Sequence, residues 1–204
     1  MARPSTPLID KDKTLEVALE IVDNEGLAAL SIRRLGKELN VAGYSLYHHF
    51  KNKEGILVAL CKYVLDQIEY KEPAGQSWQA TTLDSQMRAY EILSNHPNIV
   101  PAIIEHNLLG VRRYESEQVA RYLADKGLPA EAILALIECQ AILVAGFLSL
   151  ESLEENFSRD ASLEVDAPYL FELGKNAEFL SRAQLLKLVT LSLIDGIEKK
   201  YSLS

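Results

Sequence analysis

Two short helical patterns separated by a tight turn occupy Ser31 to Leu57, and few folds accommodate such an arrangement. The apolar residues of the first pattern recur at the spacing of one helix face: Ile32, Leu35 and Leu39. Gly36 lies between them and leaves room for a second helix to cross closely. Asn40 tolerates the left-handed backbone that ends a helix. Leu46 is spaced to pack back on the first helix. The pattern predicts a helix-turn-helix, whose second helix enters the major groove of DNA.

A period of about 3.6 residues recurs along nearly the whole chain, and no alternating strand pattern persists. We therefore expect an all-α fold. Gly26 and Gly127 are expected helix stops, and Ser77 is an expected N-cap. The helices expected outside the helix-turn-helix cover 10–25, 53–70, a stretch beginning at 78, another beginning at 97, 112–126, 129–152 and 177–200. Between the last two, a looser acidic stretch is expected over 154–164.

The clearest break in the chain is the segment Lys-Glu-Pro-Ala-Gly at 71–75. It follows the long helix expected over 53–70. We predict an N-terminal helix-turn-helix head of three helices over 1–52 and a C-terminal helical body over 53–204. The helix over 53–70 is the expected connector, and a rigid rod of this kind can convert a small shift at one end into reorientation of the other.

Charge is distributed unevenly between these two parts. Residues 1–55 contain eight Lys or Arg and eight Asp or Glu, whereas the remainder contains 13 basic and 21 acidic residues and carries the whole net charge of -8. Because phosphate repels an acidic surface, only the head is expected to approach DNA closely. The distribution argues against a protein that coats nucleic acid over its whole surface.

Cysteine content and apolar runs bear on the compartment. Cys61 and Cys139 lie in apolar helical contexts, so we expect buried free thiols in place of a metal or redox role. The polar N-terminus does not resemble a signal peptide. The longest apolar run, 132–150, is interrupted by Glu138 and Gln140, which favours a core or interface helix over a membrane span. We predict a cytoplasmic protein that has no membrane partner.

A specific motif follows the turn. Leu46-Tyr47-His48-His49-Phe50, then Lys53-Glu54 and Leu57, give the pattern LYHHF-x-x-KE-x-x-L. This pattern is rarely met elsewhere and resembles the TetR family of bacterial transcriptional repressors over about residues 10–60. Beyond the break, Gln76-Ser77-Trp78 is similar to the tetracycline-repressor branch. The resemblance implies an all-helical homodimer with a DNA-binding head and a body that binds a ligand and dimerises.

The resemblance also implies which residues of the head contact DNA. Ser31 occupies the position of a helix N-cap that commonly touches phosphate, and Tyr47 resembles a family tyrosine that donates its hydroxyl to phosphate. Lys53 begins the next helix, where a cation and a helix N-terminus together hold a phosphate. Arg33 is expected to point to DNA, whereas Arg34 is expected to stay solvated. The predicted DNA-binding residues are Ser31, Arg33, Gly43, Tyr44, Ser45, Tyr47, His48 and Lys53.

The turn and the recognition helix differ from the usual family pattern. Family members usually place glycine in the turn and Ser or Thr at the start of the recognition helix, whereas Asn40 and Gly43 stand here. Because Gly43 offers no side chain, Tyr44 and Ser45 are expected to carry more of the base recognition.

Structural roles compete with DNA contact near the motif. Phe50 and His49 are expected to pack within the head, and simple solvation is the alternative for Lys51 and Lys53, of which Lys53 is the stronger candidate for a contact. Core packing is also the alternative for Tyr47.

The body offers a candidate effector site between its helices. Its predicted ligand-binding residues are Trp78, Met87, Tyr90, His106, Asn107, Glu138 and Phe147. Buried polar groups need hydrogen-bond partners, which either a ligand or the protein itself supplies. Tetracycline-type repressors hold a magnesium-linked drug through a histidine after the fifth helix, but the neighbours of His106 do not reproduce that site. We therefore predict a moderately hydrophobic effector, with no tetracycline, metal or cofactor.

Two late helical segments are apolar around more of their circumference than one core-facing stripe requires, which marks a partner surface. The predicted dimer-interface residues are Ile142, Leu186, Val189, Leu193 and Ile197. A twofold four-helix interface is the simplest arrangement. It would set two recognition helices about 34–36 Å apart or somewhat more, so that the dimer reads palindromic double-stranded DNA.

Three functions are compared. The first is a ligand-responsive repressor, released from its operator by a small-molecule effector that prefers a body conformation with misspaced heads. The second is a DNA-binding regulator that has no small-molecule effector and uses a protein partner. The third is an enzyme in a helical bundle, which the sequence disfavours because it has no HExxH, no ExxH pair, no nucleophile elbow and no Gly-rich phosphate loop.

Overall fold

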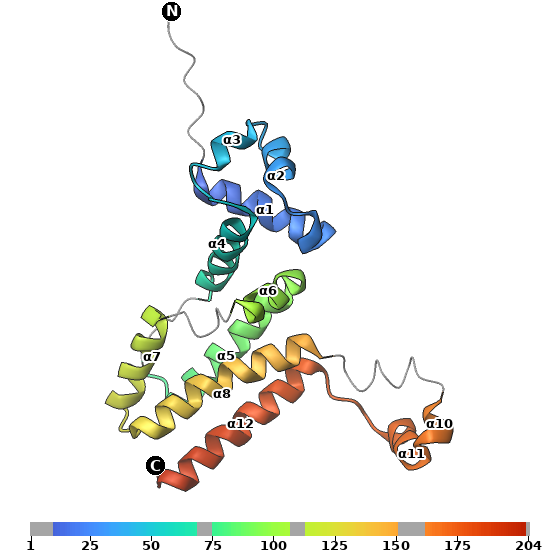
Figure 1. Ribbon diagram of the computed structural model, residues 1–204. Helices are drawn as coiled ribbons and strands as arrows, with labels where there is room; N and C mark the ends of the chain where they lie inside the picture. Colours follow the sequence, from blue (N-terminus) through green and yellow to red (C-terminus); the bar gives the residue numbers. More distant parts are fainter. Residues whose placement is uncertain (1–9, 69–74, 107–112, 151–161, 203–204) are drawn as a thin grey trace, which may run out of the picture. The chain divides into compact units, whose positions relative to one another are not determined.

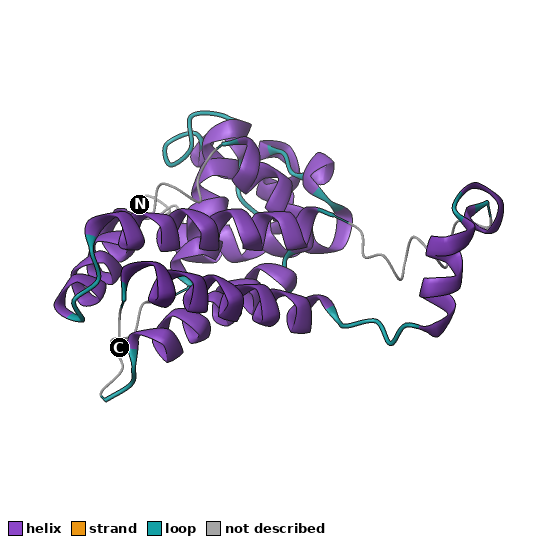
Figure 2. Cartoon of the chain, turned by 90° about the horizontal axis from the view of Figure 1, so that it is seen from below, coloured by secondary structure: helices purple, strands orange, loops and turns teal. Residues whose placement is uncertain are grey.

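The computed structural model describes residues 10–68, 75–106, 113–150 and 162–202. Every regular element in these ranges is a helix, and they contain no strand (Figure 2). The expectation of an all-α fold is confirmed. The chain forms two compact units, of which the first contains residues 1–69 and 92–112 and the second contains residues 70–91 and 113–204.

The first unit contains the predicted helix-turn-helix (Figure 1). Its elements are α1 (Lys11–Glu25), η1 (Leu27–Ala29), α2 (Ile32–Glu38), α3 (Gly43–Leu46), α4 (Lys53–Asp66), η2 (Pro97–Ile99) and α6 (Val100–Glu105). The Asp10 carboxylate caps α1 by accepting hydrogen bonds from the N–H groups of Asp12 and Lys13. Gly26 ends α1 with a φ of 81° and occupies the backbone region that favours glycine.

The turn between α2 and α3 has the geometry that the sequence predicts. Asn40 is left-handed, with a φ of 52°. A Cβ added to Gly36 would lie 3.0 Å from the carbonyl oxygen of Val41, so glycine is what allows the chain to fold back closely on α2. Leu35 of α2 and Leu46 of α3 are fully buried in the head. The two helices are therefore held by a close backbone approach and by a shared apolar core.

The segment over 92–106 packs with the head, whereas the sequence placed all residues after 52 in the body. The amide of Asn98 donates hydrogen bonds to the carbonyl oxygens of Val22 (3.0 Å) and Asp23 (3.1 Å) at the end of α1. Nδ1 of His96 lies 2.8 Å from the Asp23 carboxylate. Nδ1 of His106 lies 3.3 Å from the Glu54 carboxylate at the start of α4. Residues distant in sequence thus complete the first compact unit.

The second unit is a set of helices around one apolar core. Its elements are α5 (Trp78–Ser94, whose last turn belongs to the first unit), α7 (Arg113–Asp125), α8 (Ala130–Ser149), α10 (Leu163–Asp166), α11 (Pro168–Asn176) and α12 (Arg182–Tyr201). Trp78, Tyr122, Leu136 and Ile194 are buried in this core. Helices α8 and α12 pack against each other, as Figure 1 shows. Two short helices, α10 and α11, follow the stretch that the sequence predicts to be loose, and the last helix begins later than expected.

Helix α8 is strongly apolar, and its length and composition alone would suffice to cross a membrane. Only 22% of its most apolar window is buried inside the structure. One face packs on α12, while Leu134 and Ile142 on α8 remain 66% and 61% exposed. A strongly apolar helix with an uncovered face calls for a further partner surface.

Candidate nucleic-acid interface

The N-terminus of α2 borders a basic depression in the surface of the head. Ser31 caps this helix, because its Oγ accepts the N–H of Arg34 at 3.1 Å. An open pocket of about 540 Å³ is lined by Ala29, Ser31, Arg33, Arg34 and Lys37. Arg33 and Lys37 are exposed, and within the described ranges neither has an ion-pair partner. Two free cations beside a capped helix end suit a phosphate group.

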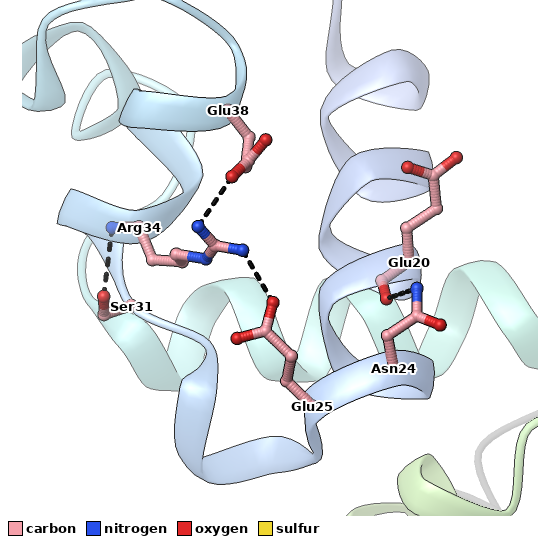
Figure 3. A network of polar contacts seen from close by, with 6 residues as sticks. All are labelled: Glu20, Asn24, Glu25, Ser31, Arg34 and Glu38. Atoms are coloured by element: carbon pink, nitrogen blue, oxygen red, sulfur yellow. Dashed lines mark hydrogen bonds and ion pairs between the residues drawn. The ribbon is translucent and has the colours of Figure 1, made fainter.

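Arg34 lines the same pocket but is engaged within the protein. One guanidinium nitrogen lies 2.6 Å from Oε1 of Glu25 and the other lies 2.7 Å from Oε1 of Glu38 (Figure 3). The sequence predicts that Arg34 stays solvated, whereas the structure holds it between two carboxylates. Its partners come from the end of α1 and the end of α2, so the network fixes one helix against the other.

The recognition helix α3 presents two tyrosines to solvent. The side chains of Tyr44 and Tyr47 are 71% and 56% exposed, which is unusual for large aromatic residues. Ser45, which was expected to share base recognition, is buried inside the head, so its side chain is not on the surface that a DNA base could contact. A Cβ on Gly43 would lie 3.5 Å from Cγ2 of Ile32, so this position packs against α2. The readable surface of α3 is therefore formed mainly by Tyr44 and Tyr47.

Residues after the recognition helix divide into core and surface. Phe50 is buried, which confirms its expected packing role, whereas His49 is exposed and the packed role expected for it is wrong. His48 is exposed as well. Nζ of Lys53 donates to the carbonyl oxygen of Leu27 at 3.2 Å and ties the start of α4 to η1. Lys53 stays exposed, so its ammonium group remains accessible while it is anchored.

The predicted effector-binding residues are not gathered in one place. Trp78 belongs to the buried core of the second unit, and Glu138 is exposed. Met87, Tyr90 and Phe147 are half-buried. His106 pairs with Glu54 in the first unit, and Asn107 lies outside the described residues.

Two glutamines join α5 to α8, and sequence reasoning did not single out one of them, Gln86. The buried Gln86 donates to the carbonyl oxygen of Gln140 at 3.2 Å, and Gln140 donates to the carbonyl oxygen of Thr82 at 3.0 Å. Gln86 follows Trp78 by eight residues and therefore shares its helix face. That spacing was the signal available in the sequence.

The predicted dimer residues also divide into two groups. Ile142 and Val189 are exposed and Leu193 is half-buried, whereas Leu186 and Ile197 are buried within the single chain. Leu186 and Ile197 therefore belong to the core of the single chain, and their predicted place on an exposed dimer face is wrong. In their place the outward face of α12 presents other large apolar residues, namely Leu185, Leu188 and Leu191.

Comparison with known proteins supplies the family. The family model for "bacterial regulatory proteins, tetR family" matches residues 15–60, which run from the first part of α1 to the middle of α4. The head of the chain therefore contains a TetR-family domain over these residues. An "HTH-type transcriptional regulator" of Saccharopolyspora erythraea is 28% identical over 147 residues, which cover 72% of this chain and 62% of the relative. The chain thus spans somewhat less than two thirds of that relative's length.

Solved structures agree with the fold of the chain. A crystal structure of the TetR family protein ActR of Streptomyces coelicolor with actinorhodin has a TM-score of 0.72 and 22% identity, and the match covers 95% of this chain and 98% of that one. A TetR variant from Acinetobacter baumannii AYE with minocycline has a TM-score of 0.75 and 20% identity, covering 94% of each chain. At these identities the likeness establishes the fold alone.

Proposed function

We propose that the chain is a DNA-binding transcriptional regulator of the cytoplasm, and specifically a repressor that binds palindromic double-stranded DNA as a homodimer and is released by a small-molecule effector. The observation that carries the DNA-binding part is the exposure of Tyr44 on α3 and of Tyr47 at its C-cap, on a head whose α2 also lines a pocket with two free cations, Arg33 and Lys37. Phosphate contacts set the register of such a head on DNA, and contacts to base edges supply sequence preference.

Roles follow from where each group lies. Arg33, Lys37, Lys53 and the hydroxyl of Tyr47 are placed to contact phosphates. Tyr44, at the exposed start of α3, contacts base edges in the major groove. Ser31 acts through its N-cap hydrogen bond, His48 supplies a contact to the DNA backbone, and Gly43 lies against Ile32 of α2 at the start of the recognition helix. The acidic remainder of the chain keeps the rest of the surface away from DNA.

Selection of DNA fragments from the source genome tests this function. The full-length protein is mixed with sheared fragments, and bound fragments are sequenced, with Tyr47→Ala as the matched control. We expect a shared palindromic motif that the control recovers poorly. Equal recovery by both proteins, or no enriched motif, would refute sequence-specific DNA binding by this head.

The homodimer rests on the uncovered faces of α8 and α12. Ile142, Leu188, Val189 and Leu191 are large apolar side chains exposed on this helix pair. Pairing with the same face of a second copy buries them by twofold symmetry. Sedimentation of the full chain at micromolar concentration should give twice the mass of the monomer, and a monomer at all concentrations would refute this arrangement.

The effector part rests on the body. The TetR-family structures cited above hold minocycline in one case and actinorhodin in the other. In this chain Met87, Tyr90 and Phe147 are half-buried apolar side chains of α5 and α8 and are candidates for contact with a moderately hydrophobic ligand. Actinorhodin serves as the first probe of release, read as loss of anisotropy from a bound labelled duplex, and minocycline, a tetracycline, is the comparison that is not expected to release the protein. A regulator that no small molecule releases, but a co-purified protein does, would instead have a protein effector.

A further inference from the structure

The network at the ends of α1 and α2 has a consequence for DNA affinity. Arg34 makes two short, charge-assisted contacts, to Glu25 at 2.6 Å and to Glu38 at 2.7 Å. Its backbone N–H is fixed by Ser31, and its Nε is buried without a hydrogen-bond partner. As Figure 3 shows, both carboxylates point to the same guanidinium from two different helices. The guanidinium is thus held by the protein's own anions.

Arg34 nevertheless lines the basic pocket together with Arg33 and Lys37. Two kinds of anion therefore compete for its guanidinium: the carboxylates of the protein, and any phosphate that occupies the pocket. With both carboxylates in place, the pocket offers a phosphate only two free cations. Without them, a third cation on the same wall becomes available, and two negative charges disappear from the edge of the DNA-facing surface.

We propose that Glu25 and Glu38 are positioning residues that hold Arg34 away from the DNA backbone and thereby weaken the sequence-independent affinity of the head. The inference rests on the DNA-binding function proposed above. Phosphate contacts supply nearly all of non-specific binding, and each one steepens the dependence of affinity on salt. The network therefore sets how strongly this head holds any duplex, while Tyr44 and Tyr47 read the sequence.

The test measures binding of the full-length protein to a random-sequence 20-base-pair duplex of labelled DNA between 50 and 200 mM KCl. For Glu25→Gln/Glu38→Gln we expect about tenfold tighter binding at the lowest salt, the magnitude of one added charged contact. The slope of log affinity against log salt should steepen by about 0.9 for each bound head, which is about 3.5-fold more loss of affinity across that range. Glu38→Gln alone, which leaves the link between α1 and α2 in place, should give a smaller change of the same sign.

Two control variants separate release of Arg34 from simple loss of negative charge. Glu20 lies on α1 near Glu25, is exposed, and in Figure 3 its carboxylate points away from Arg34. Glu20→Gln removes one negative charge, as Glu38→Gln does, without freeing a cation, so its salt slope should match the wild type. In Glu25→Gln/Glu38→Gln/Arg34→Gln no arginine is left to reach the phosphate, so the slope should return to the wild-type value.

The outcomes distinguish the alternatives. If the network serves only to stabilise the head, the double variant melts earlier and binds DNA more weakly with an unchanged slope, which overturns the inference. An equal effect of Glu20→Gln, or a steep slope that persists in the triple variant, also overturns it. Wild-type protein that binds neither the random duplex nor any selected fragment would instead overturn the proposed function itself.

Discussion

Asn98→Ala removes the tie between η2 and the end of α1. The Asn98 amide donates to the carbonyl oxygens of Val22 and Asp23 from a half-buried position. The Val22 oxygen also accepts the N–H of Gly26 at 2.8 Å and stays satisfied, so the main loss is at Asp23. At about 1 kcal/mol for each neutral hydrogen bond, we expect a loss of about 1–2 kcal/mol in the free energy of unfolding. For a chain of this size, that corresponds to a melting temperature lower by about 3–6 °C.

The assay is thermal unfolding followed by circular dichroism, together with amide hydrogen exchange at Gly26. Asn24→Ala is the matched control, because Asn24 also donates its amide to a carbonyl of α1, that of Glu20, but it does so locally and in solvent. Alanine is a better helix former than asparagine, so the control should unfold at or above the wild-type temperature. If Asn98→Ala lowers the melting temperature no more than Asn24→Ala does, the tie is not a stabilising contact of the first unit.

Three further predictions concern a thiol, a phosphate contact and an interface. Burial raises the pKa of Cys61 to about 12, so this thiol stays protonated in the folded protein and resists alkylation at pH 9, while the half-buried Cys139 reacts first. Any stability that the protein gains from this shift is lost only as the pH rises from about 9 through 12. Fast alkylation of Cys61, detected by mass spectrometry, would contradict this. Tyr47→Phe should weaken binding to all duplexes by a similar factor of about 5–10, the size of one lost hydrogen bond, and a loss confined to one base pair would refute a phosphate role. Val189→Glu combined with Ile142→Glu should give a monomer in sedimentation, and an intact dimer would place the interface elsewhere.

Local backbone chemistry made the turn and the helix ends predictable. Asn40 in the turn, Gly26 after α1 and Ser77 before α5 each have a conformational or capping preference that acts over a few residues, and all three serve as expected. The short helices α10 and α11 were missed because four and nine residues give too few turns for periodicity to stand out.

Side-chain partners were harder to foresee. Periodicity shows that Leu186 and Ile197 are apolar on α12, but only the packing of α12 on α8 decides that they face inward while Val189 faces outward. The same reasoning applies to Trp78, whose aromatic side chain fits either a pocket wall or a core until its neighbours are known. The ion pair of Arg34 with Glu25 was also not predictable, because the two residues are nine positions apart across a helix end and no helical spacing rule joins them.

The tie from Asn98 to α1 also bears on how the chain is made. Its donor and one of its acceptors are separated by 75 residues. Synthesis at about 5–20 residues per second leaves the end of α1 waiting about 4–15 s for this partner. Once α4 has been made, in the later part of that interval, the nascent head has α1 to α4 but lacks η2 and α6, so its apolar surface toward those elements is open to water and to chaperones. A fragment ending after α4 reproduces this incomplete intermediate, and a head produced on its own for DNA-binding work therefore needs the segment from η2 through α6 as well.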